Sequence, residues 1–315
     1  MLMIYVLLIL TAAVLGVTYV IYRIGFYTPV RAQLEGLSHE NRPDPDPTHL
    51  HVIEMMKQLD AIPFERVYVN SYDGLKLSGR LYYQKEGAPF LIGFHGFRGT
   101  PSWDFSGGSR MYLQLGYNIL LIEERGHCES EGHTITYGIR ERKDCLTWIR
   151  WVTDTYGSET RILIAGISMG AATVLMASGL DLPANVKGVI ADCPYTTPLD
   201  IIRKVTETDM KIPYRIARPF ILLAARLFGG FDVREGDAAE AVKHTPVPIL
   251  LIHGEADGFV PCEMGRKIAA SNPGMIEFHT FPGADHGMSY IADPARYEQI
   301  VADFTCRVLN GTENQ

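Results

Sequence analysis

The chain opens with an unbroken apolar segment. Residues 1–22 contain no charged side chain. A helix of this length, rising 1.5 Å per residue, would span roughly 33 Å, about the hydrocarbon thickness of a bilayer. Residues 1–4 are already apolar and lack the basic region that precedes the core of a signal peptide. The pattern therefore predicts a single-pass transmembrane anchor over residues 1–24, with a cleaved signal peptide and a buried core helix as alternatives.

The residues beside this segment indicate how it would sit in a membrane. Arg23 and Arg31 follow the span, whereas only the terminal amine precedes it. This charge bias favours a body on the cytoplasmic side. Four aromatic residues near the end of the span would form an interfacial belt or pack against the body: Tyr19, Tyr22, Phe26 and Tyr27.

Residues 25–63 are predicted to form a juxtamembrane spacer and a short helix. Prolines alternate with aspartates over residues 43–47. Proline removes backbone donors and favours an extended, polyproline-like chain. Thr48 is a suitable N-cap for a helix that runs through Leu59 and packs one apolar face against the body.

From residue 65 onward, short apolar runs alternate with helical patterns. An opening antiparallel hairpin turns at residues 72–74, and apolar strands are then expected at residues 90–94, 117–123, 161–165, 186–192, 247–253 and 276–281. Helical patterns lie between or after them at residues 109–115, 139–156, 169–179, 261–270 and 294–309. Continuous apolar strands are typical of a parallel sheet that is covered on both faces. We therefore predict one α/β domain over residues 64–315, with ligands bound at the carboxyl ends of its strands.

One connection is far longer than the usual two to six residues. Between the strands predicted at 186–192 and 247–253 the chain carries a segment with apolar residues at helical spacing over residues 216–228. Such a segment either packs on the domain or covers the strand ends. We predict a helical cap insertion over about residues 195–245.

Composition excludes several classes of protein. The 315 residues are 47% hydrophobic and 21% charged, with 29 lysines and arginines against 36 acidic residues and a net charge of −7. Such a chain has no basic field to attract nucleic-acid phosphates. The five cysteines are scattered and form no CxxC pair, so the sequence predicts neither a disulfide framework nor a zinc site built on such pairs.

The pattern Gly166-Ile167-Ser168-Met169-Gly170 follows an apolar strand and opens an apolar helix. This is the G-x-S-x-G nucleophile elbow in the strand-turn-helix context that it requires. The turn holds its serine in a strained backbone conformation, and the flanking positions must be small because strand and helix nearly touch. Ser168 is therefore the predicted nucleophile.

A serine hydroxyl needs a base within hydrogen-bonding reach and a carboxylate to orient that base. His286 follows the last predicted strand and Asp257 follows the one before it, in the chain order serine, acid, histidine that accompanies this motif. Asp192 is the reserve acid. The other candidates near the strand ends are His95, His253 and Asp285.

The oxyanion of a tetrahedral intermediate requires two backbone N–H donors. One normally comes from the residue after the nucleophile, here Met169, and the other from the loop after an early strand, here Phe97. A metal site remains a minor alternative for the cluster His127, Cys128, Glu131 and His133, which has no second ligand pair. We expect no metal and no cofactor.

Together these residues resemble the α/β-hydrolase fold of serine hydrolases, over about residues 64–310. Residues 124–132 resemble the D-x-R-G-H-G-x-S-x-G segment of the esterase, monoacylglycerol-lipase and serine-aminopeptidase branches, with Cys128 in place of a glycine. That replacement puts the local backbone of the loop in question. In this family the insertion would be the lid.

The resemblance implies a carboxylesterase or lipase that acts on small or medium acyl esters through an acyl-enzyme. An aminopeptidase or acylaminoacyl-peptidase is the alternative. It would need an acidic pocket for a substrate amine, for which Asp200, Glu207 and Asp209 are candidates. A non-catalytic, membrane-tethered binding module is a further alternative. The sequence leaves the oligomeric state open.

Overall fold

The computed structural model describes residues 1–29 and 46–310. Arg31 and the prolines at positions 43 and 45 of the predicted spacer lie outside the described residues. At its start, helix α4 (Pro47–Asp60) differs from the prediction, because Asp46 and not Thr48 is its N-cap. The Asp46 side chain accepts the N–H of His49 at 2.9 Å, and Pro47 fits the first helical position because no intrahelical partner is needed there.

Eight strands form one sheet in the order β1-β2-β4-β3-β5-β6-β7-β8. Strands β1 (Glu65–Asn70) and β2 (Lys76–Tyr82) pair antiparallel, and β2 also runs antiparallel to β4. The remaining strands are parallel: β3 (Phe90–Phe94), β4 (Asn118–Glu123), β5 (Ile162–Ile167), β6 (Val186–Asp192), β7 (Ile249–Gly254) and β8 (Ile276–Phe281). The predicted α/β-hydrolase fold is thus confirmed, and β3, β6 and β8 have the predicted bounds.

Helices cover both faces of this sheet, and this explains why β3, β4 and β7 are buried at every position. On one face Ile92 packs in a cluster with Trp148, and on the other Leu91 packs in a cluster with Phe304. The helices that correspond to the predicted helical patterns are α6 (Gly108–Gln114), α7 (Glu141–Tyr156), α8 (Met169–Ser178), α12 (Cys262–Ser271) and α14 (Pro294–Asn310). The short helices α5 (Pro101–Asp104) and α13 (Ser289–Ala292) were not predicted from the pattern.

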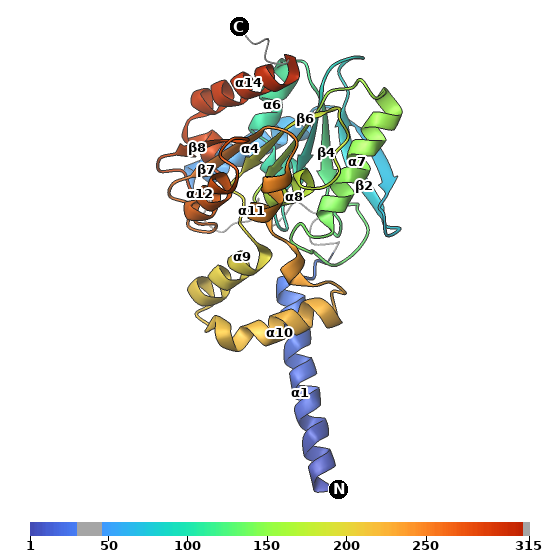
Figure 1. The fold of residues 1–315 in the computed structure, drawn as a ribbon, viewed down its shortest axis with the longest axis vertical. Helices are drawn as coiled ribbons and strands as arrows, with labels where there is room; N and C mark the ends of the chain where they lie inside the picture. Colours follow the sequence, from blue (N-terminus) through green and yellow to red (C-terminus); the bar gives the residue numbers. More distant parts are fainter. Residues whose placement is uncertain (30–45, 311–315) are drawn as a thin grey trace.

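The long connection between β6 and β7 is helical. It contains α9 (Pro198–Lys204), the π-helix η1 (Val205–Asp209), α10 (Tyr214–Leu227), the 3₁₀ turn η2 (Val233–Glu235), α11 (Ala238–Ala241) and the 3₁₀ turn η3 (Val242–His244). We call α9, η1 and α10 the cap. The cap lies at the end of the body from which the N-terminal helix projects (Figure 1).

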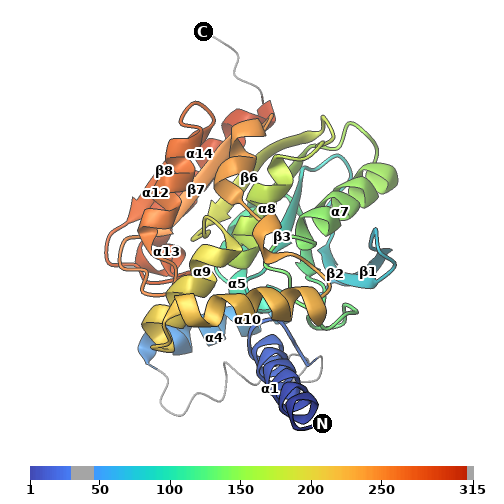
Figure 2. The same cartoon turned by 60° about the horizontal axis from the view of Figure 1, so that its bottom comes forward.

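The N-terminal helix α1 (Leu2–Gly25) is long and apolar enough to cross a membrane. Only its end touches the body, where α10 lies across it (Figure 2). Tyr22 and Phe26 are buried there, in a cluster with Ile221 and Phe231. These two aromatic residues therefore pack against the body and do not form an interfacial belt.

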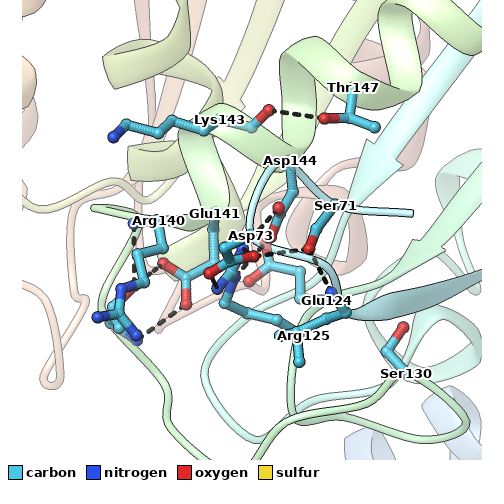
Figure 3. A network of polar contacts seen from close by, with 12 residues as sticks. Ser71, Asp73, Glu124, Arg125, Ser130, Arg140, Glu141, Lys143, Asp144 and Thr147 are labelled. Atoms are coloured by element: carbon cyan, nitrogen blue, oxygen red, sulfur yellow. Dashed lines mark hydrogen bonds and ion pairs between the residues drawn. The ribbon is translucent and has the colours of Figure 1, made fainter. Parts of the chain in front are cut away.

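A buried polar network fixes the loop after β4 (Figure 3). The Arg125 guanidinium donates to Asp144 of α7 at 2.6 and 2.7 Å and to Asp73 of the β1–β2 turn at 2.9 Å. The neighbouring Glu124 is buried, and its carboxyl oxygens have no hydrogen-bond partner among the residues that the structure describes. Burial, together with the nearby Glu141 and Asp144, raises the pKa of Glu124 well above its usual value.

Replacing Glu124 by glutamine is expected to stabilise the protein at alkaline pH. The native state keeps the Glu124 proton above its unfolded pKa of about 4.3, so the unfolded state binds fewer protons and stability falls as pH rises. Glutamine has no such proton. We expect E124Q to raise Tm by roughly 2–4 °C at pH 8, about what 1 kcal/mol does for a domain of this size.

Thermal unfolding of E124Q and wild type at pH 5 and pH 8 checks this expectation. The difference in Tm between E124Q and wild type should be smaller at pH 5 than at pH 8. The exposed Glu86 supplies a matched control, E86Q, which should change Tm little at either pH. A loss of stability in E124Q that is equal at both pH values would contradict a neutral buried carboxyl.

Candidate active site

Ser168 lies in the sharp turn between β5 and α8. Its φ is +56°, a backbone conformation that residues other than glycine rarely adopt. The turn needs both flanking glycines: a Cβ at Gly166 would lie 2.2 Å from the carbonyl carbon of Gly170, and a Cβ at Gly170 would lie 1.9 Å from the Phe94 oxygen. The sequence thus permits a turn that lifts the serine hydroxyl above the carboxyl edge of the sheet.

The structure brings the three predicted side chains together. His286, in the loop after β8, places Nε2 2.9 Å from the Ser168 hydroxyl. Its Nδ1 lies 2.7 Å from the Oδ2 atom of Asp257, in the loop after β7. A carboxylate only accepts, so Nδ1 carries the proton and Nε2 is free to accept the serine proton.

Asp257 is held as an anion. Burial by itself would raise its pKa, but hydrogen bonds from His253 and His286 and the backbone N–H of Val260 outweigh burial and hold the pKa below its usual value. The N–H groups of Phe259 and Val260 donate to its Oδ1 at 2.9 and 2.7 Å. The carboxylate therefore stays charged and fixed opposite the imidazole.

The other sequence candidates have different partners. Asp192 accepts the Ser289 hydroxyl at 3.1 Å, and Asp285 accepts the backbone N–H of Gly258 and of His286. His253 is buried, with Nε2 2.9 Å from the Val260 carbonyl and 3.4 Å from Asp257. His95 contacts the Gly96 carbonyl and accepts the N–H of Glu124. Asp257, and not Asp192, is thus the carboxylate that contacts His286.

The loop after β3 passes directly over the nucleophile. A Cβ at Gly96 would lie 3.3 Å from that of Ser168. Phe97 follows it and lines the same cavities as Ser168. Met169 is the first residue of α8, where a backbone N–H has no intrahelical partner. Both predicted donors therefore belong to segments that border the serine.

Sequence reasoning missed the residue that holds this loop. Asp104, at the end of α5, accepts the N–H of Gly96 at 2.7 Å. Burial raises the pKa of Asp104 to about 6, against the opposing effect of that hydrogen bond. The sequence signal for this role was weak: an acidic residue a few positions after the loop that follows β3, in a helix too short to recognise from the pattern.

Two residues of the loop after β4, Cys128 and His127, do not belong to the triad. Cys128 has φ +46°, the left-handed conformation that the expected glycine adopts readily, and burial raises its pKa to about 12. His127 is buried between backbone groups, accepting the N–H of Arg98 at 3.1 Å and contacting the Arg125 carbonyl. Over residues 1–29 and 46–310, the group of possible metal-ligand atoms that lie close together is Cys193, Asp257 and His286, and two of these residues belong to the triad.

Two cavities meet at Ser168. One, of about 240 Å³, has polar side chains in its wall, among them Asp104, His286 and Tyr290. The other, of about 330 Å³, lies between the cap and the end of α1 and is lined mainly by aliphatic and aromatic residues. We call them the polar cavity and the apolar cavity.

This fold and site define a serine hydrolase of the α/β-hydrolase class. Residues 103–312 match the prolyl oligopeptidase family, Peptidase_S9, and the chain belongs to that family. The uncharacterized protein YqkD of Bacillus subtilis is 26% identical over 203 residues, covering 64% of this chain and 67% of YqkD.

Lipases and esterases are also similar to this chain. The lysophosphatidylserine lipase ABHD12 of Danio rerio is 27% identical over 183 residues, covering 57% of this chain and 46% of the lipase. The chain thus spans about half the length of that relative. The esterase Pf2001 of Pyrococcus furiosus has the same fold, with a TM-score of 0.65 at 22% identity over 80% of this chain and 95% of the esterase.

Proposed function

We propose that this protein is a membrane-attached carboxylic ester hydrolase, with Ser168 as nucleophile, His286 as general base and acid, and Asp257 as the residue that orients His286. The observation that carries the proposal is the chain of contacts from Ser168 to His286 to Asp257 beside an apolar cavity. Esterases and lipases among the similar proteins support it.

The reaction follows from the contacts. The Ser168 oxygen attacks the ester carbonyl carbon while its proton passes to Nε2 of His286. The charged Asp257 stabilises the imidazolium that forms. When the tetrahedral intermediate collapses, His286 returns the proton to the alcohol oxygen, and a serine ester remains. Water, deprotonated by His286, then releases the acid and restores Ser168.

The backbone N–H groups of Phe97 and Met169 are proposed to bind the oxyanion of each intermediate. Removing one such donor typically costs about 2.7–4 kcal/mol of transition-state stabilisation. Asp104 acts here as a positioning residue, because it fixes the loop that carries Phe97.

The cavities favour an ester over a peptide with a free amino terminus. The acidic candidates of the cap have other partners: Asp200 accepts the Thr196 hydroxyl, Glu207 pairs with Arg203, and Asp209 pairs with Lys204. None of these three acids lines either cavity. Asp104 and Asp192 do line the polar cavity, but Asp104 is partly buried, Asp192 is buried, and each already accepts a hydrogen bond.

Relative rates on esters and amides test the proposed function. We expect kcat/KM for p-nitrophenyl esters to exceed that for aminoacyl-p-nitroanilides by at least about 100-fold, since the two aspartates in the described cavity walls already accept hydrogen bonds from the protein. Faster turnover of the anilides would assign the protein to the peptidases instead. A folded protein that neither turns over nor reacts with a fluorophosphonate would indicate the binding module.

Membrane attachment is proposed through α1, with the body in the cytoplasm. The apolar length of α1 and the charge of Arg23 after it support this placement. A reporter fused after residue 315 should be active when it requires the cytoplasm. Activity restricted to a reporter that requires the opposite side would reverse the orientation.

A further inference from the structure

The apolar cavity is built by three parts of the chain that are distant in sequence. Its walls come from the end of α1, from the cap and from the loop after β3, with Ser168 at its boundary. The residues of α1 and its C-terminal end are Ile21, Ile24, Gly25 and Phe26, and the aliphatic residues of the cap region are Ile201, Ile202, Val205, Met210, Ile212, Ala217 and Ile221. The membrane helix is therefore part of the wall of a cavity that reaches the nucleophile.

The end of α1 is fastened to the body by hydrogen bonds. Arg98 donates through Nη2 to the carbonyls of Ile24 and Tyr27 at 2.8 and 2.9 Å, and the Tyr137 hydroxyl donates to the Gly25 carbonyl at 3.0 Å. The last carbonyls of a helix have no intrahelical partners, and the bonds to Ile24 and Gly25 satisfy two of them. Arg98 is the cationic residue in the cavity wall. Its guanidinium already donates to these carbonyls, so its charge does not indicate an acidic ligand.

The size and lining of the cavity indicate its occupant. A volume of about 330 Å³ lies at the low end of the roughly 300–1,000 Å³ range of small-molecule sites. That volume, in an aliphatic wall, suits one hydrocarbon chain and not two. The polar cavity on the other side of Ser168, at about 240 Å³, leaves room for the alcohol part of the ester.

The surface around the cavity indicates where the chain enters. Met210 and Ile212 line the cavity and are also 47% and 40% exposed. Ile216 and Leu227, on α10, are exposed apolar residues of the same cap. Since α1 leaves the body beside α10, the cap that carries these residues lies on the side from which a membrane that holds α1 would approach (Figures 1 and 2). Basic residues interleave with them at Lys211, Arg215, Arg218 and Arg226, as in helices that rest on a lipid surface.

We propose that the apolar cavity is an acyl-chain site whose wall includes the membrane helix, and that its substrates are long-chain, single-chain esters that enter from the bilayer. This inference rests on the proposed ester hydrolysis and adds its substrate class. The acyl carbonyl lies at Ser168, the chain extends between the cap and α1, and the alcohol part occupies the polar cavity.

Filling the cavity tests this site. In the full-length protein in mixed micelles, I21W narrows it from α1 and I202W narrows it from the cap. For each variant we expect the ratio of kcat/KM for p-nitrophenyl palmitate to that for p-nitrophenyl acetate to fall at least about tenfold, because a long chain needs the whole cavity. Matched controls place tryptophan at exposed positions outside the wall, V20W on α1 and L223W on α10. Their ratio should stay within about twofold of wild type.

The possible outcomes separate this inference from the proposed function. Fluorophosphonate labelling and acetate turnover show that a variant is folded and that ester hydrolysis holds. An unchanged palmitate-to-acetate ratio in both cavity variants would then overturn the acyl site alone. An unchanged ratio in I21W with a fall in I202W would remove α1 from the wall. Loss of labelling and of all ester turnover in wild type would overturn the proposed function itself.

A second measurement tests whether the apolar cavity accepts only one hydrocarbon chain of the substrate. In phosphatidylcholine vesicles that contain either a monoacyl or a diacyl glycerol ester, we expect the monoacyl ester to release fatty acid at least about tenfold faster. Equal rates would contradict a cavity for a single chain.

Discussion

Replacing Ser168 by alanine is expected to lower kcat on p-nitrophenyl esters by roughly 10⁶-fold, the loss seen when a triad nucleophile is removed. The hydroxyl is the group that lies 2.9 Å from His286 at the junction of the two cavities. The residual rate would come from the oxyanion donors and from binding alone. Fluorophosphonate labelling should disappear in the same variant.

A buried serine in α8, the helix that follows Ser168, provides the control for this experiment. Ser178, the last residue of α8, donates to the Leu175 carbonyl and lies outside both cavity walls. S178A should keep its labelling and its turnover within a few-fold of wild type. If S168A kept its labelling and most of its turnover, the nucleophile would have to be another residue.

Replacing Asp257 by asparagine is expected to lower kcat by about 10⁴-fold while KM changes little. The asparagine amide can donate to Nδ1 of His286 and so favour the tautomer whose Nε2 carries a proton and cannot accept the serine proton. KM is spared because Asp257 lines neither cavity. Steady-state kinetics on one ester separates the two parameters.

Two further variants make the Asp257 result specific. D181N, at an exposed aspartate, should behave as wild type. D192N tests the reserve acid, whose carboxylate contacts Ser289 and not His286. An active D257N together with an inactive D192N would transfer the orienting role to Asp192.

The sequence indicates the candidate site well because that site depends on local rules. The turn at Ser168 demands small residues at positions 166 and 170, and the distances at these two glycines show why. Asp257 and His286 follow apolar strands that could be recognised singly, and parallel strands bring their carboxyl ends to one edge. Their proximity follows from topology, while their catalytic roles stay a prediction.

Other features depend on contacts that no local pattern contains. Asp104 acts through a hydrogen bond to the Gly96 backbone, eight residues earlier in the chain. Tyr22 and Phe26 fit an aromatic belt as well as a packed cluster, and the choice is decided by Phe228 and Phe231 about 200 residues away. The N-cap of α4 was misplaced because Asp46 and Thr48 are both suitable capping residues and both lie beside Pro47.

The bond between Arg98 and the end of α1 has a consequence for any shortened form of this protein. A fragment that begins after Thr28 would leave that guanidinium without the Ile24 and Tyr27 carbonyls, next to the residue proposed to bind the oxyanion. It would also expose the Tyr137 and Phe231 rings that Phe26 covers. Removing the helix to gain solubility would thus alter the enzyme at its reaction centre, and rates measured on such a fragment would not describe the intact protein.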